Sequence, residues 1–134
     1  QSIIEGLNCP IFNLHISYLP YNRGAHPNFW SFVDNTPSGV SIHLVDKGVD
    51  TGPIVYQKIV TFAEIEKTFS QTYTTLIREI ETLFINNLDD LLRGSWTAKP
   101  QIGKGSHHFS KDLPESFSGW SSNIKDELRR LGIG

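Results

Sequence analysis

An apolar stripe in the middle of the chain limits most strongly what this sequence can fold into. Its members recur at steps of three and four residues: Phe69, Tyr73, Leu76, Ile77, Ile80, Leu83, Phe84, Leu88 and Leu91. This spacing is typical of an amphipathic helix that packs one face against a core. Thr68 and Gln71 fit a capping box at the start, and Gly94 fits a stop at the end. We therefore predict one long packing helix over 68–93.

Three other segments have the character of β-strands. Residues 10–17 (PIFNLHIS) alternate apolar with polar side chains, which indicates a strand with two different faces. Segments 39–46 and 53–62 are rich in β-branched residues, and glycines in the loop between them permit a tight turn, so we expect a hairpin-like pair. A short helix is expected over 28–33, after Pro27. Strands combined with a long helix predict an α/β fold.

The end of the chain differs in character from the rest. Residues 96–134 are expected to be an irregular C-terminal extension with one short helix at about 122–131. Residues 1–95 then form the main domain, and 134 residues are enough for one hydrophobic core.

Composition narrows the class of protein. Hydrophobic residues make up 38% and charged residues 19%, which is typical of a globular domain. The net charge is −2 and the longest basic cluster is Arg129–Arg130, so we expect no nucleic-acid partner. The apolar runs are too short for a membrane span, and no signal peptide opens the sequence, so we expect a cytoplasmic location. The single cysteine, Cys9, excludes an internal disulfide and is interpreted as a buried thiol.

Asn13, His15 and Asp50 are the first candidate functional residues. Asn13 and His15 lie two apart on the predicted strand, so their side chains point to the same face. They are either a hydrogen-bonded structural pair or a site at the carboxyl end of a strand, where open α/β sheets bind ligands. Asp50, between Gly48 and Gly52, is either a turn residue or a member of the same site. Spacing alone leaves both alternatives open.

The other histidines do not indicate a metal centre. His26, His43, His107 and His108 lack the helical spacing of a zinc site, and one cysteine adds little as a ligand, so we predict no metal. His43 is interpreted as structural because it lies in a predicted strand. His107 and His108 are interpreted as a solvated or loop pair.

Two stretches together resemble one enzyme family. FNLHISYLPYNRGAHPNFW (12–30) and GVSIHLVDKGVDTGPIVYQ (39–57) are similar to 10-formyltetrahydrofolate-dependent formyltransferases. The family combines Asn-x-His, a Ser-x-Leu-Pro turn and a later Asp-x-Gly, here residues 13–15, 17–20 and 50–52. The combination is specific, although each part alone is weak.

The resemblance implies a fold and a reaction. The chain is expected to be the C-terminal part of a formyltransferase-type Rossmann-like sheet, with the N-terminal half of the catalytic domain outside it. The implied reaction moves a formyl group from 10-formyltetrahydrofolate, a co-substrate, to a primary amine without a metal. Asn13 would bind the developing oxyanion, His15 would take or relay the amine proton, and Asp50 would orient His15.

The resemblance also suggests the substrate. The segment SYLPYNRGAHPNFWSF and the later GKGSHHFSKD look most like the branch that acts on nucleotide-linked amino sugars. The expected substrate-binding residues are Ser17, Tyr21, Arg23, Gly24, His26 and Trp30. Among them, Arg23 would grip a phosphate. The expected folate-binding residues are Val45, Asp46, Lys47 and Gly48.

Several alternatives remain open on the sequence. The amine can be that of methionyl-tRNA or of glycinamide ribonucleotide, although the basic domain expected for a tRNA substrate is lacking. The chain can also be a non-catalytic α/β module that binds a ligand or self-associates. As a fragment it is expected to be inactive and to form a homo-oligomer across an exposed strand edge.

Overall fold

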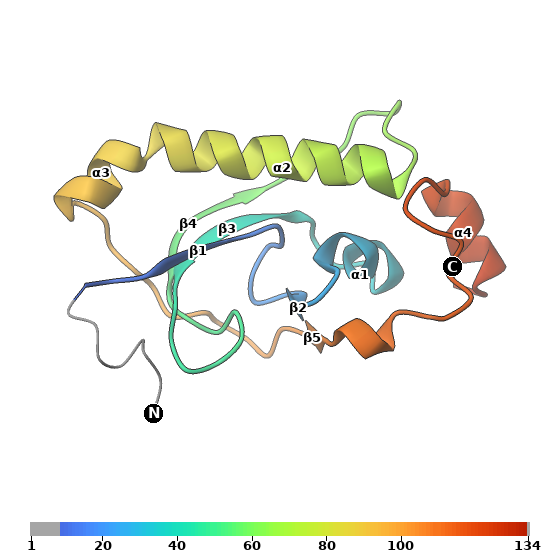
Figure 1. The fold of residues 1–134 in the computed structure, drawn as a ribbon, viewed down its shortest axis with the longest axis horizontal. Helices are drawn as coiled ribbons and strands as arrows, with labels where there is room; N and C mark the ends of the chain where they lie inside the picture. Colours follow the sequence, from blue (N-terminus) through green and yellow to red (C-terminus); the bar gives the residue numbers. More distant parts are fainter. Residues whose placement is uncertain (1–8, 134) are drawn as a thin grey trace.

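The computed structural model describes residues 9–133, which form a mixed α/β structure (Figure 1). In chain order the elements are β1 (Phe12–His15), β2 (Arg23–Gly24), α1 (Pro27–Val33), β3 (Gly39–Leu44), β4 (Ile54–Ile59), α2 (Phe69–Asn86), α3 (Leu88–Arg93), β5 (His107–His108), the short 3-10 helix η2 (Ser110–Asp112) and α4 (Ile124–Arg130). Strands β1, β3 and β4 form one antiparallel sheet in the order β1-β3-β4. The predicted α/β class and the hairpin-like pair are confirmed.

Helix α2 covers one face of this sheet. The predicted capping box is present: the Thr68 side chain accepts from Gln71 N, and the Gln71 side chain accepts from Thr68 N. The prediction of one unbroken helix to residue 93 is wrong. Asn87 leaves the helical conformation and donates its side-chain amide to Leu83 O at 2.8 Å, which separates α2 from α3. Gly94 ends α3 in the left-handed conformation, as expected.

Two hydrophobic clusters hold the structure together. The first lies between the sheet and α2, with buried residues Val40, Ile42, Val60, Leu76 and Ile80. The second joins α1, α2 and α4 through Phe29, Phe69 and Ile124, of which Phe29 and Phe69 are fully buried. Since the central strand β3 contributes Val40 and Ile42 to the first cluster, its position relative to α2 is set by packing.

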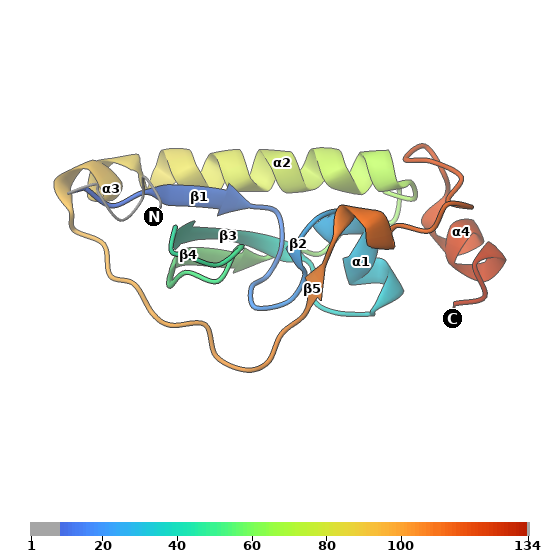
Figure 2. The same cartoon turned by 60° about the horizontal axis from the view of Figure 1, so that its bottom comes forward.

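The C-terminal extension returns along the whole length of the molecule, as Figures 1 and 2 show. Lys99 exchanges both backbone hydrogen bonds with Ile54 at the start of β4. Further on, β5 pairs in parallel with β2, Arg23 with His107 and Gly24 with His108. The short helix α4 then completes the second hydrophobic cluster, so the extension is a packed part of the same structure.

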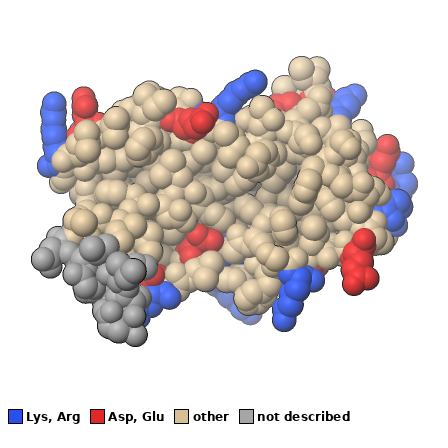
Figure 3. Space-filling view, in the orientation of Figure 1, with Lys and Arg blue, Asp and Glu red and all other residues tan. Residues whose placement is uncertain are grey.

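No helix within residues 9–133 is both long enough and apolar enough to span a membrane. In the face shown in Figure 3, charged side chains lie mostly near the outline, and lysines and arginines do not gather into one patch. Cys9 is exposed, so the expectation of a buried thiol is wrong. It lies before β1, at the start of the described residues.

Candidate active site

The carboxylate of Asp50 is the point where the candidate residues meet. Its Oδ1 accepts from Asn13 Nδ2 at 3.2 Å and lies 3.3 Å from His43 Nε2. Its Oδ2 accepts from the backbone N–H of Gly24 at 2.8 Å and lies 3.6 Å from His15 Nε2. The side chain of Asp50 is 9% exposed. One carboxylate therefore connects β1, β2, β3 and the loop that follows β3.

Register explains why the amide and the second histidine are close together. Asn13 on β1 lies directly opposite His43 on β3, and Asn13 Nδ2 is 3.3 Å from His43 Nε2. The register between β3 and β4 shifts between Ile42 and His43, and such irregularities commonly re-aim side chains beside active sites. Asn13 is exposed whereas His43 is 2% exposed, so the amide has access to a substrate and the ring lies beneath it.

His15 lies at the end of β1 on the same face as Asn13. Its Nε2 lies 3.0 Å from the backbone oxygen of Asn22. A carbonyl only accepts, so this contact assigns a hydrogen to Nε2 and leaves Nδ1 of the neutral ring to accept a proton. Asn22 is itself held by hydrogen bonds to Thr36 and Ser106.

The environments of the two histidines separate their pKa values. Burial lowers the pKa of His15 and outweighs the opposing charge of Asp50. Burial also acts to lower the pKa of His43, but the hydrogen bond to Asp50, the Leu44 carbonyl and the charges of Asp50 and Asp46 outweigh it, so this pKa is raised. Groups whose pKa values are pushed apart are candidates for distinct roles in proton transfer. Of the two rings, His15 is therefore the more readily neutral and His43 the more readily protonated.

Asp50 is held firmly as a carboxylate. Burial raises its pKa, but the hydrogen bond from His43, the charge of His15 and the Gly24 amide outweigh burial and bring the pKa to about 2. An ionised Asp50 can accept from several donors at once, which matches its contacts.

Left-handed backbone conformations surround this carboxylate. Asp50 has φ 56°, and Asn22, whose carbonyl binds His15, has φ 59°. Non-glycine residues adopt this region rarely, and such strain commonly gathers at functional sites. Gly24 has φ 88°, and a Cβ there would lie 2.2 Å from His108 O. Glycine is therefore required for β2 to approach both β5 and Asp50.

Gln101 in the C-terminal extension holds the loop that carries Asp50. Its Nε2 donates to the backbone oxygens of Asp50 at 2.8 Å and Gly52 at 2.9 Å. Its Oε1 accepts from Arg23 Nε at 3.0 Å and Arg23 Nη2 at 2.7 Å. Arg23 also donates to Lys104 O at 3.5 Å. The guanidinium expected to grip a phosphate is therefore engaged with the extension.

The other expected substrate residues lie in different environments. Ser17 is 2% exposed and its hydroxyl has no hydrogen-bond partner among the described residues, whereas Tyr21 is 36% exposed. Trp30 stacks on His108 with ring centroids 4.1 Å apart, and His108 Nε2 lies 2.7 Å from Asp34 Oδ2. The interpretation of His108 as a solvated or loop residue is therefore wrong, because it is held between a tryptophan and a carboxylate.

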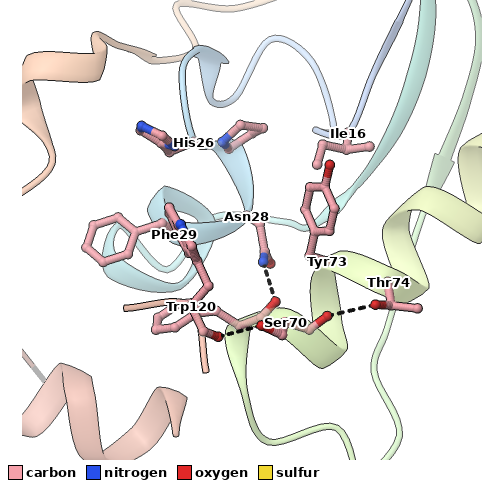
Figure 4. A pocket seen from close by; sticks show the side chains of 10 residues that line it. Ile16, His26, Asn28, Phe29, Ser70, Tyr73, Thr74 and Trp120 are labelled. Atoms are coloured by element: carbon pink, nitrogen blue, oxygen red, sulfur yellow. Dashed lines mark hydrogen bonds between the residues drawn. The ribbon is translucent and has the colours of Figure 1, made fainter. Parts of the chain in front are cut away.

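His26 is the expected substrate residue that borders a pocket. This pocket of about 550 Å³ lies between the start of α1, the start of α2 and the end of β1 (Figure 4). Its wall is mainly apolar and aromatic and includes Ile16, Phe29, Tyr73 and Trp120. The Tyr73 hydroxyl points toward Ile16, the residue after His15. The pocket therefore begins one residue away from the candidate base.

The expected folate-binding residues form the first half of the loop between β3 and β4. Asp46 Oδ1 accepts from Gly48 N at 3.0 Å and from Thr51 Oγ1 at 2.6 Å, which gives the loop internal structure. Val45 donates its backbone N–H to Ile11 O at 2.8 Å. Asp46, Lys47 and Gly48 are exposed, so they can contact a ligand placed beside Asn13. Among the described residues, no group of three or more His, Cys, Asp or Glu is placed to hold a metal ion.

Three further residues of the site were not identified from the sequence. His43 and Gln101 contact Asp50, and Asn22 contacts His15. A histidine in an otherwise apolar strand weakly indicates a polar site, since a buried polar ring needs a hydrogen-bond partner. Gln101 and Asn22 give no such signal, because their roles depend on contacts between distant segments and on a backbone oxygen.

An exposed amide donor above a buried imidazole and a buried, ionised carboxylate is an arrangement suited to proton-coupled group transfer. The sequence profile described as formyl transferase matches residues 1–87. The chain belongs to this formyltransferase family, and the resemblance stated above is confirmed.

Individual relatives agree with this assignment. The dTDP-4-amino-4,6-dideoxyglucose formyltransferase of Mycobacterium tuberculosis is 32% identical over 132 residues, covering 98% of this chain and 50% of the relative. A methionyl-tRNA formyltransferase of Thermodesulfovibrio yellowstonii is 36% identical over 128 residues, covering 93% of this chain and 41% of the relative. The chain thus spans about half the length, or less, of these curated relatives.

Solved structures show the same fold. The crystal structure of the formyltransferase PseJ from Anoxybacillus kamchatkensis, in complex with UDP-4,6-dideoxy-4-formamido-L-AltNAc and tetrahydrofolate, is 42% identical. It superposes with a TM-score of 0.79 over 85% of this chain and 62% of that one. The family's fold therefore accounts for most of this chain.

Proposed function

We propose that the protein carrying this chain transfers a formyl group from 10-formyltetrahydrofolate to the amine of a nucleotide-linked amino sugar. The observation that carries the proposal is the meeting of the exposed Asn13 with His15 and Asp50 around one carboxylate. Relatives that act on or bind nucleotide-linked sugars support the substrate class. Residues 1–95 are proposed as the C-terminal part of the catalytic domain and residues 96–134 as its extension.

Each member of the trio has a defined part in this reaction. The amine forms a bond to the formyl carbon, and the bond from that carbon to the folate nitrogen breaks. Asn13 donates an N–H to the formyl oxygen as negative charge develops on it. His15 accepts the amine proton at Nδ1 and returns a proton to the leaving nitrogen. Asp50 holds Asn13 and stabilises the protonated form of His15.

The binding residues expected from the sequence remain part of the proposal. Val45 and the exposed loop residues Asp46, Lys47 and Gly48 would hold the folate beside Asn13. Tyr21, Gly24, His26 and Trp30 would line the approach of the sugar, together with Ser17. Arg23 would have to give up its hydrogen bonds to Gln101, at 3.0 and 2.7 Å, to bind a phosphate. Both bonds have ordinary hydrogen-bond lengths.

A direct assay tests this function. The full-length protein is incubated with 10-formyltetrahydrofolate and either a dTDP-linked or a UDP-linked 4-amino sugar, and release of tetrahydrofolate is followed. We expect turnover that falls by about 10²–10⁴-fold in His15→Ala. His107→Ala, an exposed histidine outside the trio, is the matched control and should keep its activity. Turnover that survives His15→Ala would show that the catalytic assignment is wrong.

Methionyl-tRNA is the second candidate substrate, because a methionyl-tRNA formyltransferase is 36% identical over most of this chain. The same assay with methionyl-tRNA in place of the sugar separates the two. The net charge of −2 and the scattered lysines and arginines of the face in Figure 3 favour the sugar.

Self-association and location complete the proposal. Among the described strands, β1 pairs only with β3, and Leu14 on it is 39% exposed. An open edge with apolar side chains favours pairing with another strand, so the isolated chain is proposed to form a homo-oligomer there. Light scattering at micromolar concentration tests this, and a monomer would contradict it. A cytoplasmic location is proposed from the single cysteine, since it makes no internal disulfide.

A further inference from the structure

The hydrogen bonds of His43 depend on its protonation state in a way that affects Asn13. His43 Nδ1 lies 2.9 Å from Leu44 O, and because a carbonyl only accepts, Nδ1 carries a hydrogen. The other nitrogen, Nε2, faces two groups at the same distance: Asn13 Nδ2 at 3.3 Å and Asp50 Oδ1 at 3.3 Å. Whether Nε2 also carries a hydrogen decides which of these two it bonds.

A count of hydrogens separates the two states. Asn13 Nδ2 has two hydrogens, and one is donated to Asp50 Oδ1 at 3.2 Å. A neutral His43 would accept the second hydrogen at Nε2, and Asn13 would then have none for a substrate. A protonated His43 instead donates from Nε2 to Asp50 Oδ1, which has two lone pairs and can accept from both residues. One N–H of Asn13 is then free.

We propose that His43 is a positioning residue which, as the imidazolium, donates to Asp50 and so frees one Asn13 N–H for the formyl oxygen. The inference rests on the proposed formyl transfer and assigns His43 a part in that same site. His43 does not touch the substrate, since its side chain is 3% exposed beneath Asn13. Its effect reaches the reaction through the direction of the Asn13 hydrogens.

The surrounding charges favour the protonated state. From the β3–β4 loop, Asp50 contacts the ring and Asp46 acts on it from farther away. From β1, the ring of His15 lies with its centroid 6.5 Å from that of His43, but His15 is the histidine whose pKa is lowered. The pKa of His43 is raised despite burial of the ring, chiefly by the hydrogen bond to Asp50. His15 is thus neutral where His43 is charged.

Histidine-selective ¹⁵N NMR of the full-length protein tests the protonation state directly. At pH 6.5 we expect His43 to be mainly the imidazolium, with both ring nitrogens protonated, and His15 mainly neutral. The signals are assigned with His43→Gln and His15→Gln variants. A His43 that is mainly neutral at pH 6.5 would overturn the proposal, whatever the activity of the protein.

The pH dependence of kcat tests the role. The unaltered protein should lose about tenfold in kcat per pH unit above the pKa of His43, as Nε2 loses its hydrogen. In His43→Gln, the side-chain amide stands close to where Nε2 stood and cannot lose its donor, so this loss at high pH should disappear while KM stays within about twofold. His107→Gln is the matched control and should keep the original profile.

The outcomes are separable. If a folded His43→Gln variant keeps the same fall of kcat at high pH, the proposal is overturned, because that fall then cannot come from the titration of His43. A lack of formyl transfer by the unaltered protein would overturn the proposed function itself, and the NMR result would still report whether His43 is charged. If His43→Gln fails to fold, as judged by its thermal transition, the NMR measurement on the unaltered protein decides, with the His43 signal assigned by elimination from single His→Gln variants of the other four histidines.

Discussion

The backbone N–H of Gly24 donates to Oδ2 of Asp50, 26 residues later in the chain, at 2.8 Å. This bond places the carboxylate between β2 and β1, within reach of His15. Position 24 admits only glycine here, because of its positive φ and its approach to His108 O. A backbone group thus fixes the orientation of the side chain on which both histidines depend.

Gly24→Ala should therefore damage the site more than the fold. The added Cβ would lie 2.2 Å from His108 O, so β2 must move away from β5 and from Asp50. We expect kcat to fall by about 10²-fold, as for other small misplacements of a catalytic group. Stability should fall by about 1–3 kcal/mol in urea denaturation. In Gly103→Ala, where φ is 95° but no atom lies within 4 Å of the added Cβ, kcat should be unchanged.

Asp50 should make stability depend on acid pH. Its pKa in the folded chain is about 2, against 3.8 in the reference state, so the unfolded chain binds the proton first as pH falls. The corresponding stabilisation, about 2 kcal/mol, is fully present above pH 4 and is lost as pH falls toward 2. Asp50→Asn should flatten this part of the stability curve, measured by urea denaturation between pH 2 and 5. Asp89→Asn, an exposed position on α3, should leave the curve unchanged.

The acid side of the activity profile should report His15. Because burial lowers its pKa below 6.5, kcat should rise with pH through a midpoint below 6.5 as the ring becomes neutral. The measurement is kcat of the full-length protein between pH 4.5 and 7. A midpoint above 6.5 would contradict a buried, neutral His15, whereas His107→Gln should reproduce the unaltered curve.

Gln101→Ala should lower kcat by more than its loss of stability explains. The substitution removes the two hydrogen bonds to the Asp50 loop and the acceptor of Arg23, for a stability loss of about 1–3 kcal/mol. We expect kcat to fall at least tenfold because the loop loses its fixed position. Gln71→Ala, away from the site, removes the Gln71 half of the capping box of α2, which accepts from the backbone N–H groups of Lys67 and Thr68, and should also lower stability. Equal kcat values in the two variants would show that Gln101 only stabilises the fold.

Sequence patterns predicted the parts of this structure that depend on local physics. Helix α2 and its cap follow from apolar spacing and from Thr68 with Gln71, and the shared face of Asn13 and His15 follows from strand alternation. The break at Asn87 was missed, because one asparagine hydrogen-bonding the preceding turn leaves the apolar spacing intact.

The site was only partly predictable, because several of its contacts join segments that are distant in the sequence. Asp50 came from the family resemblance, since an aspartate between glycines is ordinarily a turn residue. His43 reaches Asn13 only because the two lie opposite each other in one register, and alternation within a strand says nothing about register between strands. Gln101 and Asp50 are 51 residues apart, beyond any local pattern.

That separation has a consequence for how the protein is made. Synthesis runs from the N-terminus, so β3, β4 and the loop between them leave the ribosome before Gln101 exists. Until then the carbonyl oxygens of Asp50 and Gly52 lack the amide that binds them in the finished structure. The nascent chain therefore holds all the reactive side chains before it holds them in place, and the residue that fixes the Asp50 loop takes no part in the chemistry.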